Sequence, residues 1–271
     1  MMHSNWLYEV ILLCHSLSLI GYILYFISSK WKIKRVAFTL FIAVWFLQTT
    51  SIVYEIIVTK TFPIVSLHDG VYFYVWILLT FTLLLNAFYQ IQFFVLLTNV
   101  FTFFMTALSV LLNAQQQSID RSTQLIHEIL MAHITLSILS YSFFTVSFLL
   151  ALMYLIQYYL LKRKKGLKWM WRFTNLAKLD LYSYYAIVIG VPLLLIGLIL
   201  GVVWAYVSGD TFYWFDLKTI GSILLLIIYS LYLLLRQDTA FHGKSISVYS
   251  SATFLVLLVN FFLFSSLSQF H

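Results

Sequence analysis

Long apolar segments separated by short polar connections dominate the sequence. They cover residues 6–28, 36–58, 70–88, 92–113, 127–161, 183–207, 214–236 and 246–268. A helix needs about twenty apolar residues to cross the hydrocarbon core of a bilayer, and each segment has about that length or more. The strands of a membrane β-barrel would instead be about ten residues long and would alternate in polarity. The segments therefore predict an all-α, polytopic membrane protein with eight transmembrane helices.

The composition supports this fold class. Hydrophobic residues make up 62% of the 271 residues, and charged residues only 9%, whereas a soluble domain carries about a quarter charged residues. A soluble fold of this size has too little interior to bury so much apolar surface, so lipid must cover it. The start of the chain has no basic segment and no small-residue cleavage site, so it is expected to be a retained first helix. We expect residues 1–271 to form one integral membrane domain.

Lysine and arginine are distributed unevenly between the connections. Thirteen of the sixteen lie in the connections 29–35 and 162–182 or after residue 235, and the alternation of eight segments places all of these on one side. Because cytoplasmic connections are enriched in basic residues, this side is predicted to be cytoplasmic and both termini to lie outside. The net charge of +7 is thus an orientation signal that suits anionic lipid, and it does not indicate nucleic-acid binding.

The most basic connection alternates cations with large apolar side chains. Its sequence is KRKKGLKWMWRFTNLAKLD, residues 162–180. Such a segment is typical of an interfacial helix that lies on the inner leaflet. A docking surface for a cytosolic partner is the second interpretation, and the two are compatible. The cations expected to contact such a partner are Lys162, Arg163, Lys164, Lys165, Lys168 and Arg172.

The interiors of the apolar segments are almost free of charge. No Asp, Glu, Lys or Arg occurs between Asp69 and Asp120, and the cores of the other segments also lack them. Charged groups inside a membrane are costly and usually mark ion or proton pathways, so their absence argues against an ion-coupled transporter. The sequence also lacks HExxH, GxSxG and a phosphate-binding loop. We therefore do not expect an enzyme.

Histidine supplies the remaining chemistry. Those expected at or near the outer surface are His3, His68, His127, His133 and His271. His15 is expected about 13 Å inside the first segment, and His242 on the cytoplasmic side. A neutral imidazole offers a lone pair to a metal, and histidines beside aromatic side chains suit heme, whose iron takes two axial imidazoles. Histidines and aromatic residues also occur at membrane interfaces without any ligand, and this alternative stays open.

Five segments carry motifs that occur together in one group of membrane proteins. YWFD (213–216) stands where that group has a tryptophan-rich outer loop, WGxxWxWDPKE. GVVWA (201–205) and IYSLYLLLR (228–236) match the helix ends on either side of the loop. FPIVSLHDGVYFYVW (62–76) is similar to FPxxNxYESLxFxxW, and residues 129–156 are similar to WLxIHVxxxxxxYxxFxxSFxLAxxYLI. Together these motifs resemble the cytochrome c assembly family, the CcsA/CcmC heme-handling proteins.

The resemblance implies a heme site. By this resemblance His133 corresponds to one outer axial histidine of the family and His271 corresponds approximately to the second. Both are therefore expected to bind the iron of heme b. The residues expected around the porphyrin are Trp204, Tyr213, Trp214, Phe215, Asp216 and Lys218. Lys218 suits a heme propionate, and Asp216 suits either this site or the N-terminal cap of the next helix. Lower-ranked candidates are His15, His68 and Asp69.

The sequence departs from the family pattern at several positions. Leu217 and Thr219 replace a proline and a glutamate, and Leu234 stands where the family keeps a transmembrane histidine that relays heme. The chain is most similar to the HemX-type branch of the family. That resemblance implies a heme-binding regulator of heme biosynthesis, with glutamyl-tRNA reductase as its partner. Heme delivery in cytochrome c maturation and porphyrin transport are the alternatives.

Overall fold

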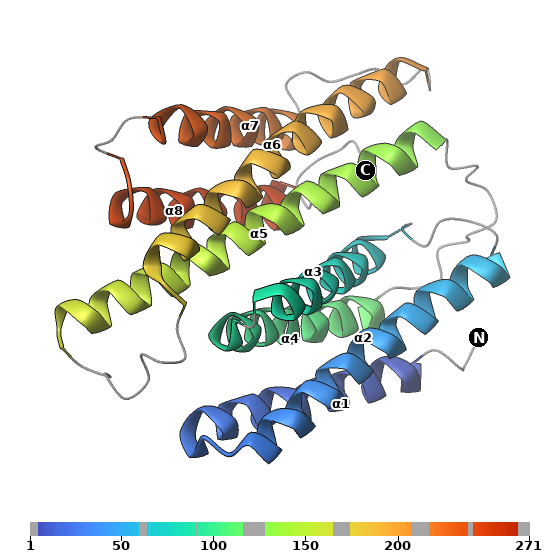
Figure 1. The fold of residues 1–271 in the computed structure, drawn as a ribbon. Coiled ribbons are helices and arrows are strands. Elements are labelled where there is room, and N and C mark those ends of the chain that lie inside the picture. The colour runs from blue at the N-terminus through green and yellow to red at the C-terminus, as the bar shows by residue number, and fades with distance from the viewer. Residues whose placement is uncertain are drawn as a thin grey trace. The chain divides into compact units, whose positions relative to one another are not determined.

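The regular elements of the protein are helices throughout the part of the chain that the structure describes (Figure 1). This computed structural model describes residues 5–59, 64, 66–89, 91–115, 128–164, 174–207, 217–237 and 241–264. The elements are α1 (Asn5–Ser28), α2 (Trp31–Thr59), α3 (Leu67–Tyr89), α4 (Gln92–Gln115), α5 (Glu128–Lys162), α6 (Leu176–Val207), α7 (Leu217–Leu235), α8 (Lys244–Val259) and the π-helical turn η2 (Asn260–Phe264). Eight helices within these ranges are long and apolar enough to cross a membrane. The predicted multi-pass, all-α membrane fold is confirmed, and the sidedness of the termini stays a prediction.

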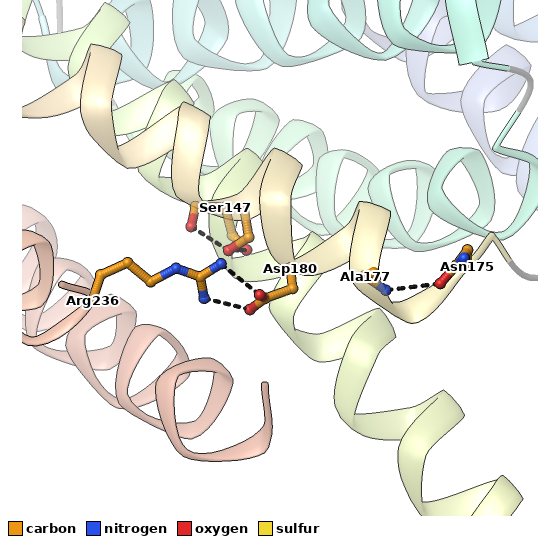
Figure 2. A network of polar contacts seen from close by, with 6 residues as sticks. Ser147, Asn175, Ala177, Asp180 and Arg236 are labelled. Atoms are coloured by element: carbon orange, nitrogen blue, oxygen red, sulfur yellow. Dashed lines mark hydrogen bonds and ion pairs between the residues drawn. The ribbon is translucent and has the colours of Figure 1, made fainter. Parts of the chain in front are cut away.

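Some helices begin earlier than their apolar segments. α2 begins at Trp31 and α6 at Leu176, whereas the hydropathy predicted that these helices begin at residues 36 and 183. Asn175 explains the start of α6, because its side-chain oxygen accepts a hydrogen bond from the backbone N–H of Ala177 at 2.9 Å (Figure 2). Such a cap satisfies one of the free N–H groups of the first turn, whatever the polarity of the residues that follow. The basic connection predicted at 162–182 therefore ends at Asn175.

The fifth helix is longer than one bilayer crossing requires. α5 has 35 residues, which corresponds to about 52 Å against a hydrocarbon core of about 30 Å. α6 packs along it (Figure 1). A Cβ atom added at Gly190 would lie 2.6 Å from the ring of Phe144, and one added at Gly197 would lie 3.0 Å from the hydroxyl of Ser137. The small-xxx-small pattern GLILG (197–201) therefore lies where α6 packs closely against α5.

The chain divides into two compact units. The first is Met1–Leu125 and the second Ile126–His271. In the first unit α1 packs against α2 and α4, and α3 packs against α2 and α4. In the second unit α5 packs against α6 and α8, and α7 packs against α6, α8 and η2. The single membrane domain over residues 1–271 stays a prediction.

Polar side chains join the helices within each unit. On α4 the buried residues Asn99 and Thr102 face α1, where Asn99 donates a hydrogen bond to the hydroxyl of Ser18 at 2.9 Å. In the second unit the hydroxyls of Ser147 and Ser183 lie 2.8 Å apart and join α5 to α6 (Figure 2). Lipid and apolar side chains are equally hydrophobic, so interhelical hydrogen bonds and close packing hold such bundles together.

Candidate functional site

His133 is the predicted heme ligand whose position the structure defines best. It lies near the start of α5 and turns toward α6, where its Nδ1 is 2.6 Å from the carbonyl oxygen of Gly197. A carbonyl oxygen only accepts, so Nδ1 carries the hydrogen and Nε2 keeps its lone pair. Histidines that bind metals are commonly held in this way, through the ring nitrogen that does not bind the metal. His133 is therefore in the tautomer needed to bind a metal through Nε2.

Lys218 lies in the first turn of α7, in the same unit as His133. Its ammonium group is close enough to act electrostatically on the His133 imidazole. Trp204 is half-buried and lies on α6, about two turns beyond Gly197. A cation beside a histidine suits a ligand that combines a metal with carboxylates. His133 and Lys218, two residues of the predicted site, are thus within electrostatic range of each other.

Other predicted residues of this site lie outside the described part of the chain. They are Tyr213, Trp214, Phe215, Asp216 and His271. The described helices fix only where the aromatic segment is attached: α6 runs to Val207, and α7 begins at Leu217, next to Lys218. The roles of these five residues stay predictions.

His15 lies in the interior of the first unit, and its predicted depth in the membrane stays a prediction. Its side chain is fully buried. Its Nε2 is 3.2 Å from the hydroxyl of Thr102, and its Nδ1 is 3.3 Å from the hydroxyl of Thr106. The edge of its ring contacts Phe103, with centroids 5.9 Å apart. Because both nitrogens have hydroxyl partners, the geometry is that of a packed, hydrogen-bonded histidine, and its role as a ligand stays a prediction.

His68 and Asp69 also have structural partners in the first unit. The Nδ1 of buried His68 donates a hydrogen bond to the carbonyl of Ser109 at 2.7 Å. Asp69 accepts hydrogen bonds from the backbone N–H and the hydroxyl of Ser66 at 3.0 and 2.8 Å, and the Asp69 N–H donates back to that hydroxyl at 3.2 Å. This is a capping box, which starts α3. The spacing Ser-x-x-Asp is visible in the sequence and is typical of such a helix start, but the start of α3 was not predicted from it.

An ion pair that was not predicted from the sequence lies at the other end of the second unit. The guanidinium of Arg236, just after α7, donates to the carboxylate of Asp180 on α6, with N···O distances of 2.8 and 2.5 Å (Figure 2). The two side chains are only 11% and 14% exposed. These hydrogen bonds raise the pKa of Arg236 above its usual value. The guanidinium also lies 5.4 Å from the centre of the Tyr184 ring, a cation–π contact.

Three of the cations expected to bind a partner lie at the far end of α5. Lys162, Arg163 and Lys164 are all exposed. Along α5, Lys162 is about 43 Å from His133. The other expected cations, Lys165, Lys168 and Arg172, lie outside the described residues.

Comparison with known proteins decides the family. The model for the cytochrome C assembly protein family matches residues 64–271, which include His133, Trp204 and Lys218. The chain belongs to this family. The family region therefore contains the described part of the candidate site, and the predicted resemblance is confirmed.

The more similar relatives belong to one branch of the family. The chain is 44% identical to Protein HemX of Bacillus subtilis (strain 168) over 263 residues, which cover 97% of this chain and 95% of that protein. It is 33% identical to Protein HemX of Brevibacillus brevis over 273 residues, which cover 100% and 99%. Cytochrome c biogenesis protein CcsA of Chlamydomonas reinhardtii is 30% identical over 206 residues, which cover 72% of this chain and 56% of that protein. The predicted placement in the HemX-type branch is thus confirmed.

Proposed function

We propose that this protein is a heme-binding membrane regulator of heme biosynthesis that acts on glutamyl-tRNA reductase and has no catalytic activity of its own. The observation that carries the proposal is the state of His133: the Gly197 carbonyl accepts the hydrogen bond from its Nδ1–H, so its Nε2 keeps a lone pair, and the ammonium group of Lys218 acts electrostatically on this imidazole. The similarity to HemX proteins over nearly the whole chain supports the regulatory role.

The described residues fit heme better than they fit a bare metal ion. Among them, no group of three or more His, Cys, Asp or Glu side chains is placed to hold a metal. A protein-bound zinc ion takes three or four protein ligands. The iron of heme takes four ligands from the macrocycle and needs only one or two from the protein. One histidine with a defined tautomer and one nearby cation for a propionate are therefore a sufficient start for a heme site.

In the proposed site each residue has a separate task. Heme b, when bound, would supply an iron centre that takes nitrogen ligands. His133 would bind that iron through Nε2, and His271 is the predicted second ligand. Lys218 would pair with a heme propionate. The aromatic side chains of residues 213–215 are expected to cover the porphyrin face.

The same unit offers a path from this site to a cytosolic partner. α5 is one continuous helix from the turn that holds His133 to the exposed cations Lys162, Arg163 and Lys164. The predicted sidedness places these cations in the cytoplasm, where a tRNA-dependent reductase works. Exposed cations suit an acidic patch on such a partner and would steer its approach.

Heme binding by the purified protein is the first test of this proposal. We expect that hemin added to the full-length protein in detergent gives a shifted Soret band and, after reduction, sharp α and β bands of a low-spin histidine complex. The measurement is a titration followed by absorption, with hemin in the same detergent as the blank. A spectrum identical to that of the blank would refute the heme-binding proposal.

The partner surface has a test of its own. We expect the triple change Lys162→Gln, Arg163→Gln and Lys164→Gln to lower recovery of glutamyl-tRNA reductase with the membrane protein about tenfold, from about 0.5 kcal/mol for each exposed cation. The readout is the amount of reductase that co-purifies from solubilised membranes. The matched control is Lys30→Gln, Lys32→Gln and Arg35→Gln, which removes the same charge from another predicted cytoplasmic connection. Equal recovery with both triple variants would rule out this docking surface.

The similarity to CcsA supports heme delivery to c-type cytochromes as a second candidate function. Leu234, which occupies the place of the family's relay histidine, is 63% exposed and offers no metal ligand. Deletion of the gene separates the two functions. Loss of c-type cytochromes would favour delivery, whereas an altered amount of glutamyl-tRNA reductase with normal cytochromes would favour regulation.

A further inference from the structure

The ring of His133 lies directly against α6 at Gly201. A Cβ atom added at Gly201 would lie 2.7 Å from Cε1, 2.8 Å from Nδ1 and 3.3 Å from Nε2 of that ring. Carbon atoms of real side chains almost never come closer than about 3 Å to such neighbours, because repulsion rises steeply below van der Waals contact. The edge of the ring formed by Nδ1 and Cε1 therefore lies where only a glycine leaves it room.

Gly197, one turn earlier on α6, fixes the direction of the same ring. Its carbonyl accepts the hydrogen bond from Nδ1 at 2.6 Å. A Cβ atom at Gly197 would lie 3.0 Å from the hydroxyl of Ser137, which itself donates to the carbonyl of His133 at 2.8 Å. A carbonyl oxygen has two lone pairs, so Gly197 can accept this bond in addition to its bond within the helix. The acceptor is part of a helix backbone and cannot rotate away as a side chain could.

We propose that Gly197 and Gly201 are positioning residues for the heme ligand: they hold His133 at one ring tilt with the hydrogen on Nδ1, so that Nε2 is the nitrogen presented to iron. This inference rests on the proposed function and adds two residues to it. An imidazole that is already oriented loses less conformational freedom when it binds a metal, and affinity rises accordingly.

A purely structural role for the two glycines is the competing explanation, and α6 contains a matched control for it. Gly190 also lies against α5, where an added Cβ atom would be 2.6 Å from the ring of Phe144. Its carbonyl also accepts a hydrogen bond from an α5 side chain, the hydroxyl of Ser140, at 2.8 Å. Gly190→Ala therefore disturbs the same helix pair to a similar degree without touching His133.

The test compares Gly201→Ala and Gly190→Ala in the full-length protein in detergent, by hemin titration, by the reduced α band and by thermal denaturation. We expect Gly201→Ala to weaken heme binding about tenfold or more and to shift or broaden the α band. Gly190→Ala is expected to lower the denaturation temperature as much while keeping the wild-type spectrum and affinity. Wild-type affinity and spectrum in Gly201→Ala, or equal changes in both variants, would overturn the inference.

A gentler variant covers the case in which Gly201→Ala does not fold. Gly197→Ala meets Ser137 at 3.0 Å, a contact that a shift of a few tenths of an ångström relieves. We expect a loss of affinity of several-fold, because the shift lengthens the hydrogen bond that orients the ring. Unchanged affinity and spectrum in a folded Gly197→Ala protein would overturn the inference.

Nitrogen-15 NMR of histidine in the heme-free protein separates this inference from the proposed function. The His133 signals are assigned by their loss in His133→Gln. We expect the Nδ1–H tautomer in the wild type and in Gly190→Ala, and a mixture of tautomers in Gly201→Ala. The Nε2–H tautomer in the wild type would overturn the inference even if heme binds. If the expected tautomers are found in a protein that binds no heme, the positioning of His133 is supported and only the proposed heme site is refuted.

Discussion

Replacing His133 by glycine is expected to abolish axial ligation of heme in the purified protein, and added imidazole is expected to restore it. The variant removes the side chain whose Nε2 lone pair is proposed to bind the iron, and it leaves the Gly197 carbonyl in place to orient a free imidazole. Even partners that only hold a metal ligand contribute about 10- to 100-fold to affinity, so loss of the ligand itself should cost about 100-fold or more. Hemin titration with and without imidazole measures both effects.

His242 provides the control for this experiment. It is an exposed histidine in the connection between α7 and α8. His242→Gly removes the same side chain, and it is expected to keep the wild-type Soret band and affinity. If His133→Gly also kept them, the iron would have another ligand and the assignment of His133 would be wrong.

The fold was predictable from the sequence because each helix must be apolar over about the thickness of a bilayer. The ends of the helices were less predictable. α6 begins at Leu176 because the side chain of Asn175 caps it, and α3 begins with the capping box of Ser66 and Asp69. These starts depend on local hydrogen bonds, which a hydropathy profile does not contain.

The site was predictable only in part. Motif similarity found His133 and Lys218, which are within electrostatic range of each other. It did not find the carbonyl of Gly197, because every residue has a backbone carbonyl and the sequence gives no sign of which one an imidazole will meet. The spacing of Gly197 and Gly201 is that of a helix-packing motif, and the same absence of side chains makes room for the ring of His133.

Contacts between segments that are far apart in the sequence could not be predicted, for a different reason. Asp180 and Arg236 are 56 positions apart in the sequence. Each belongs to a short polar stretch where charged residues are common and usually solvated. Only the packing of α6 beside α7 shows that they meet, and that water is largely excluded from the pair.

Arg236→Ala is expected to cause a large loss of stability in the second unit. It leaves the carboxylate of Asp180, which is mostly buried, without its partner, and it removes the contact with Tyr184. Breaking a buried ion pair on one side costs about 3–5 kcal/mol, and the remaining exposure of this pair favours the lower end, about 3 kcal/mol. Denaturation of the full-length protein in detergent measures the change, and Lys178→Ala, at an exposed cation on the same turn of α6, is the control.

The double change Asp180→Leu and Arg236→Met separates the two parts of this loss. A buried ion pair often contributes little compared with well-packed apolar side chains, whereas a single unpaired charge is strongly destabilising. The double variant should therefore recover most of the stability that Arg236→Ala loses. If Arg236→Ala instead stays within about 0.5 kcal/mol of the wild type, as surface substitutions do, water must reach Asp180. The ion pair would then be a surface contact that does not hold the ends of α6 and α7 together.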